Sequence, residues 1–183
     1  VKGTFSVPSD TVKAISRAQP FFDFLFSGNS PYHIFDTVNV TVQFNPVGHD
    51  VQGFSLFMDY DTLAVKLLDG DLKVEGLQPI GVDPVLALTG AQVLQNRIDP
   101  IRNGRIDFGL GFLPELEDAS VHVGSLRFLG LRDTTTRLWV VHDTSSTRQT
   151  ALTDRANGGV IRPYIKPPNS IVFKNFRVKG QVA

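Results

Sequence analysis

The chain has 183 residues, with 18 basic and 18 acidic side chains and no cysteine. The balanced charge excludes a bulk attraction to nucleic acid or to an anionic membrane surface, so neither is expected as a partner. The lack of cysteine excludes disulfides, thiolate nucleophiles and cysteine-ligated metal sites. With 16 glycines, 11 prolines and one methionine, the composition favours an all-β chain over a helical bundle.

The N-terminal region is the only place where the sequence predicts a helix. Ser9 or Asp10 can cap it, and apolar residues recur at helical spacing until Pro20 ends the run. The chain contains no linker-like stretch that would divide it further. We therefore predict an N-terminal extension over residues 1–20, with a short helix, and one domain over residues 21–178.

From Phe21 onwards the apolar period changes to two, as expected for strands with one buried face. The clearest alternation runs from Thr37 to Phe44, and a second places Phe54, Leu56, Met58 and Tyr60 on one face. Further strand-like runs, most of them bounded by turn residues, are Ala64–Leu68, Leu72–Val74, Val93–Ile98, Arg105–Leu110, Val121–Leu131, Arg137–His142, Val160–Ile165 and Ser170–Val178. Some nine to ten short strands are typical of a β-sandwich.

No catalytic motif is present. The sequence lacks the metalloprotease, nucleophile-elbow, phosphate-loop and dinucleotide patterns, so an enzyme is not expected. A carboxylate pair that meets only in the folded protein leaves a hydrolase open. The acidic pairs Asp59/Asp61 and Asp69/Asp71 suit a hard cation, although Asp69-Gly70-Asp71 is also explained as a turn. We expect no cofactor, with Ca²⁺ at these pairs as the alternative.

The strand around Phe57 carries a candidate contact surface. If Phe54, Leu56 and Met58 face the core, then Ser55, Phe57 and Asp59 lie on the opposite face. An aromatic ring among small and charged neighbours on a sheet surface is typical of a recognition site. The alternative is that the N-terminal extension covers Phe57.

The order of several segments resembles the cohesin domains. Gln52–Val65, in which a strand ending in Tyr-Asp is followed by a short turn and Leu-x-Val, is similar to the family signature. Looser matches, all in the family's order, are Asp36–Val42 with Phe35 at a position usually held by glycine, Gly104–Gly109, Val123–Phe128 and Ala156–Ile161. The resemblance covers about Phe21 to Ile165.

This resemblance implies a nine-stranded jelly-roll β-sandwich that binds a protein and catalyses no reaction. Cohesins bind dockerin modules through one sheet face, and here that face would present Ser55, Phe57 and Asp59, with Arg105 and Asp107 on the neighbouring strand. Ser55 stands where well-known cellulosomal cohesins have a contact aspartate. A dockerin-like partner and an extracellular or cell-surface location are therefore expected.

Two other functions remain open at this stage. A carbohydrate-binding module would present a row of exposed aromatic rings to a polysaccharide. Its candidates are few, namely Tyr32, Tyr60, Trp139 and Tyr164, of which Tyr60 and Trp139 look inward or ambiguous. The other alternative is a structural cell-surface or adhesion domain without a soluble ligand.

Overall fold

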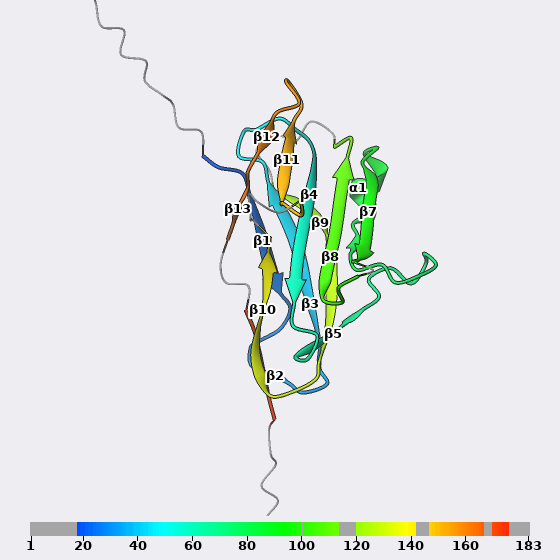
Figure 1. The fold of residues 1–183 in the computed structure, drawn as a ribbon, viewed down its shortest axis with the longest axis vertical. Helices are drawn as coiled ribbons and strands as arrows, with labels where there is room; N and C mark the ends of the chain where they lie inside the picture. Colours follow the sequence, from blue (N-terminus) through cyan, green and yellow to red (C-terminus); the bar gives the residue numbers. More distant parts are fainter. Residues whose placement is uncertain (1–17, 100, 114–119, 142–146, 167–169, 176–183) are drawn as a thin grey trace, which may run out of the picture.

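The computed structural model describes residues 18–99, 101–113, 120–141, 147–166 and 170–175, and these form two packed β-sheets (Figure 1). The first sheet contains β1 (Phe21–Phe26), β3 (Thr37–Asn45), β5 (Val65–Leu68), β6 (Gly81–Val82), β9 (Val121–Gly130) and β13 (Tyr164–Ile165). The second sheet contains β2 (Tyr32–His33), β4 (Val51–Tyr60), β7 (Gln92–Ile98), β8 (Arg105–Gly111), β10 (Thr134–Val140), β11 (Ala151–Asp154), β12 (Val160–Ile161) and β14 (Ser170–Lys174). The predicted all-β sandwich is confirmed.

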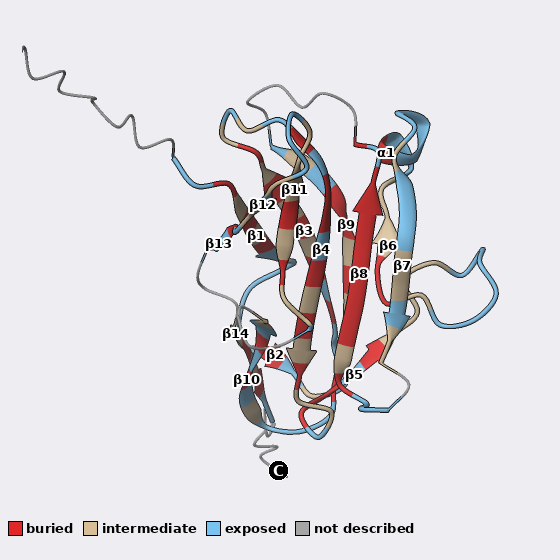
Figure 2. Ribbon diagram, turned by 45° about the horizontal axis from the view of Figure 1, so that its top comes forward, coloured by how far each residue is buried: buried red, intermediate tan, exposed pale blue. Residues whose placement is uncertain are grey.

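The core lies between the sheets and follows from the alternation of the sequence. Even-numbered residues of β3 and β4, from Val38 to Phe44 and from Phe54 to Tyr60, are buried. Aromatic rings join the two layers, since Phe22 of β1 lies 5.1 Å from Phe54 of β4 between ring centroids. Figure 2 shows that burial also extends over most of β8, whereas β7 at its side is largely exposed.

Several local predictions need correction. The described helix α1 (Pro84–Leu88) was not predicted, although Asp83 caps it by accepting a hydrogen bond from the amide of Val85. The strand predicted over Leu72–Val74 is wrong, because these residues form an exposed turn. Strand β11 was missed. The helix predicted before residue 18 lies outside the described residues, and no helix that the structure describes is long and apolar enough to span a membrane.

Strand pairing places β4 at the centre of the second sheet. On one side β4 pairs with β8, which in turn pairs with β7. On its other side it pairs with β11 through Val51–Ser55 and with β10 through Met58–Tyr60. The outward face around β4 is therefore built from β8 and β7 on one side and from β10 and β11 on the other.

Phe35 adopts a strained backbone conformation. Its φ is +71° and its side chain is 72% exposed, so the ring gains little from burial. A left-handed conformation costs an L-residue roughly 1–2 kcal/mol, whereas glycine adopts it freely. This is the position at which the family resemblance led us to expect glycine.

We expect Phe35→Gly to raise the free energy of unfolding by about 1 kcal/mol, or the melting temperature by about 2–4 °C for a domain of this size. Phe35→Ala is the matched control, because it removes the ring but keeps the Cβ that causes the strain. Thermal unfolding of both variants tests this. An alanine variant as stable as the glycine variant would contradict it.

Candidate functional site

The five predicted contact residues lie on one face. Ser55, Phe57 and Asp59 alternate outward on β4, and the β4–β8 register pairs Phe57 with Asp107 and Asp59 with Arg105. Cross-strand partners project from the same face of a sheet. The structure therefore brings together all of these residues. Trp139 of β10 joins them as the partner of Asp59, and its side chain is 48% exposed.

Arg148, just before β11, occupies the middle of this face. Its Nε donates to Asp107 at 2.8 Å, and its Nη1 donates to Asp59 at 2.8 Å. Its Nη2 donates to the carbonyl oxygens of Met58 and Ile106 at 3.4 and 3.3 Å. The guanidinium thus spans β4 and β8 and bridges their carboxylates.

The same guanidinium covers Phe57. Its carbon lies 5.5 Å from the ring centroid, which is a cation–π arrangement, and Phe57 is only partly exposed. Phe57 is therefore less available than the sequence pattern indicated. The alternative, that the N-terminal extension covers Phe57, concerns mainly residues 1–17, which lie outside the described residues.

Electrostatics favour the charged state of this cluster. Burial alone would lower the pKa of Arg148, but hydrogen bonds to Asp59 and Asp107 outweigh that effect and raise it. At the nearby end of β7, the backbone amide of Ile101 is the main cause that holds the pKa of Asp99 below its usual value. Arg105 lies 3.8 Å from Asp99 and 4.0 Å from Asp59, at ion-pair distance.

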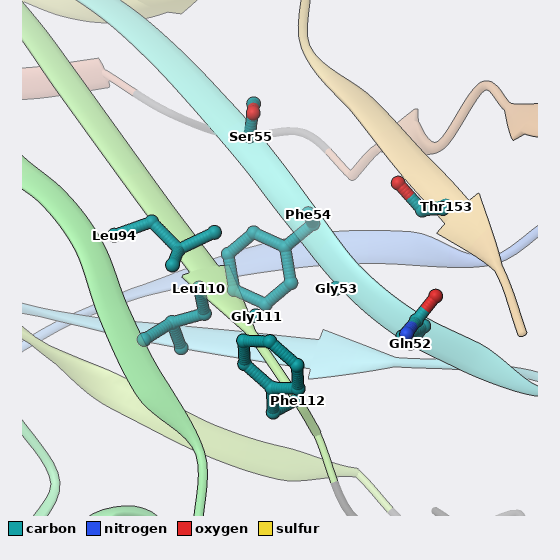
Figure 3. A pocket seen from close by; sticks show the side chains of 9 residues that line it. All are labelled: Gln52, Gly53, Phe54, Ser55, Leu94, Leu110, Gly111, Phe112 and Thr153. Atoms are coloured by element: carbon teal, nitrogen blue, oxygen red, sulfur yellow. The ribbon is translucent and has the colours of Figure 1, made fainter. Parts of the chain in front are cut away.

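The other end of the face is hollow rather than charged (Figure 3). Gly53 of β4 and Gly111 of β8 leave its floor without side chains, and Ser55 adds only a hydroxyl group. Leu94 and Phe112 stand at its sides, 64% and 57% exposed. The cavity volume is about 210 Å³.

Sequence reasoning missed Arg148, Leu94 and Phe112. Arg148 is separated from Asp59 by 89 residues, so no local pattern connects them. The only signal for the hollow was the repeated glycine of Gly109-Leu110-Gly111, at the end of the predicted strand Arg105–Leu110, which we considered only as an incomplete dinucleotide pattern.

The acidic pairs considered for calcium are used in other ways. Asp61 pairs with Arg132 at 3.0 Å and accepts from the amide of Leu63. Asp69 accepts from the amides of Asp71 and Gln78, as in a turn. Among the described residues, no three histidine, aspartate or glutamate side chains are grouped so that they could hold a metal ion. Calcium binding stays a prediction.

Comparison with known proteins supports the architecture through structure alone. No protein-family model and no curated protein matches the sequence. A type II cohesin from a cohesin–X–dockerin complex of Acetivibrio cellulolyticus is 15% identical with a TM-score of 0.63, over 85% of this chain and 100% of that chain. A type II cohesin from Bacteroides cellulosolvens is 13% identical with a TM-score of 0.63, over 84% of this chain and 99% of that chain.

A more distant match is the cohesin module of a family 33 glycoside hydrolase from Clostridium perfringens, with 8% identity and a TM-score of 0.57 over 87% of this chain and 100% of that chain. At such low identities the similarity concerns the fold. The chain is a β-sandwich with the cohesin fold, as the resemblance predicted.

Proposed function

We propose that this domain is a non-catalytic binding module that docks a dockerin-like protein on the outward face of β4, β8, β7 and β10. The observation that carries the proposal is that exposed side chains surround the Arg148 cluster on that face. Around the closed Arg148 cluster, Ser55, Leu94 and Trp139 remain exposed. Exposed aromatic and large apolar side chains such as Trp139 and Leu94 are typical of protein contact surfaces.

The comparisons support a partner of this class. Two of the matched structures are described as a cohesin–X–dockerin complex and as a complex of a dockerin with a cohesin. Others are modules of scaffoldins. By this likeness we propose an extracellular or cell-surface location for the present domain.

The test is a binding assay with a panel of dockerin modules, using calorimetry and co-migration in size-exclusion chromatography. Trp139→Ala and Ser55→Arg are expected to weaken the complex at least tenfold, because exposed tryptophans are frequent hot spots and an arginine at position 55 would obstruct the face. Leu25→Arg on β1 of the other sheet is the control, at 44% exposure. Equal loss in the control variant, or no complex with any dockerin, would reject the proposal.

The carbohydrate-binding alternative has one observation in its favour, namely that Trp139 is half exposed and points outward. Tyr60, however, is buried, and the exposed Tyr164 lies on the first sheet. A platform of several rings on the outward face is therefore not formed by these candidates. Affinity electrophoresis in a series of polysaccharides separates the two functions, because only a carbohydrate-binding module would be retarded.

A further inference from the structure

The hollow beside Ser55 has a floor made of backbone. Gly53 cannot carry a side chain, because a Cβ there would lie 2.6 Å from the carbonyl oxygen of Leu110. Gly109 and Gly111 follow at alternate positions of β8 and therefore face the same side. Glycine in a strand interior weakens the strand, and it often marks a place where another group approaches closely. The glycine floor therefore leaves room for a group of a partner to approach the backbone closely.

Two walls of the hollow, Leu94 and Phe112, are apolar and have unusual backbone positions, and Gln52 and Thr153 line another part of it. The β7–β8 register shifts between Val93 and Gln95, so Leu94 is the extra residue of a bulge. The bulge directs Leu94 over the floor, since its Cδ1 would lie 2.9 Å from a Cβ at position 111. On the opposite wall Phe112 is exposed at a φ of +56°. Water is a poor occupant for such walls, whereas an apolar side chain would remove both from solvent.

The exposed charge next to the hollow is positive. The Asp107 side chain is only 7% exposed and is held by Arg148, and that of Asp59, also bound by Arg148, is 36% exposed. By contrast, the side chain of Arg97 is 62% exposed, lies 3.9 Å from Asp107 and, with the Gln95 amide oxygen turned toward it, donates to that neutral group at 2.9 Å. A partner that approaches this region meets a cation before it meets a carboxylate.

The spacing between the hollow and Arg97 matches a helix. Gly111 of the floor pairs with Gln92, and Asp107 pairs with Arg97, so the two positions are separated by four residues of β8, or about 13 Å. Two turns of an α-helix advance about 11 Å. A helix that lies along β7 and β8 can therefore place one side chain in the hollow and another, two turns away, within reach of the long Arg97 side chain.

We propose that the partner of this face is an acidic amphipathic helix that inserts one large apolar side chain between Leu94 and Phe112 and directs an aspartate or glutamate, seven or eight residues away, to Arg97. This rests on the proposed function and identifies the chemistry of the partner. It moves the centre of recognition from Phe57, which Arg148 covers, to the glycine floor. The exposed guanidinium selects acidic helices and disfavours basic ones.

The experiment uses yeast display of a two-helix scaffold in which the outward positions of one helix are randomised, sorted against the full chain. We expect recovered binders to share a leucine, isoleucine, phenylalanine or methionine with an acidic residue two turns away. Their affinity should fall more than tenfold with Leu94→Arg. Gly111→Ala should act similarly, because the added methyl meets only side-chain atoms of Leu94 and pushes them into the hollow. With Arg97→Glu as the bait, the acidic preference should change to lysine or arginine.

Leu63→Arg is the control, since Leu63 is exposed to a similar extent, 69%, in a loop outside the hollow. Binders without the apolar–acidic pattern, binders insensitive to Leu94→Arg and Gly111→Ala, or a failure to recover any binder would overturn the inference. Failure of this inference can be distinguished from failure of the proposed docking function. If dockerin binding is lost with Trp139→Ala and Ser55→Arg but not with Leu94→Arg, the docking function stands and the helix-anchor inference is wrong.

Discussion

Replacing Arg148 with methionine is expected to lower the free energy of unfolding by about 3 kcal/mol, the lower end of the range for breaking a buried ion pair. Methionine retains much of the apolar stem over Phe57 but leaves the carboxylate of Asp107, 7% exposed, without the 2.8 Å hydrogen bond from Nε. The carbonyl oxygens of Met58 and Ile106 also lose a donor. Urea unfolding at neutral pH, followed by circular dichroism, measures the effect.

A double-mutant cycle identifies the cause. Adding Asp107→Asn to Arg148→Met removes the buried charge that has lost its nearest cation, so the double variant should regain more than half of the loss. Arg105→Met is the matched control, because Arg105 makes only ion pairs of 3.8 and 4.0 Å and such contacts contribute about 1 kcal/mol or less. If Arg148→Met and Arg105→Met were equally stable, Arg148 would not hold the face together.

The sequence predicted the two-sheet architecture because its strongest signal has a simple physical origin. Where one face of a strand is buried and the other is solvated, as in β3, side chains alternate between apolar and polar. The same periodicity placed Ser55, Phe57 and Asp59 on the outward side of β4 correctly. Short elements lack this signal. Strand β11 has four residues, and α1 has five with only Leu86 buried.

The features that shape the candidate site could not be inferred because they depend on distant parts of the chain. Phe57 looked exposed from its neighbours on β4, and only the fold brings Arg148 over it. The availability of Arg97 depends in turn on Arg148, which already holds Asp107. The bulge at Leu94 is a matter of strand register, and nothing in the residues of β7 alone specifies it. Composition indicated no net charge, whereas beside the hollow the cation is exposed and the carboxylate buried, at 62% for the Arg97 side chain and 7% for that of Asp107.

A close backbone contact between Gly70 and Gly81, next to the first sheet, helps to hold β7 in position. Gly70 and Gly81 approach so closely that neither has room for a side chain, and Gly81 also lies over Gly124 of β9. The next residue back, Ile80, is fully buried, and the side chain of Asn96 on β7 bonds both its amide and its carbonyl, at 3.1 and 2.7 Å. The loop that contains these glycines therefore fixes the strand that carries Leu94 and Arg97.

For this reason Gly81→Ala is expected to destabilise the domain by about 3 kcal/mol, at the upper end of the usual cost of overpacking. The added Cβ would lie 2.2 Å from the carbonyl oxygen of Gly70, and a backbone atom cannot move aside as a flexible side chain does. Gly76→Ala is the control: φ is +86° there, but nothing lies within 4 Å of the new methyl, so only backbone strain of about 1 kcal/mol is added. Urea unfolding compares the two variants, and hydrogen exchange should show faster opening of β7 in Gly81→Ala only. Equal destabilisation would mean that conformational strain, rather than the contact behind β7, determines the need for glycine at position 81.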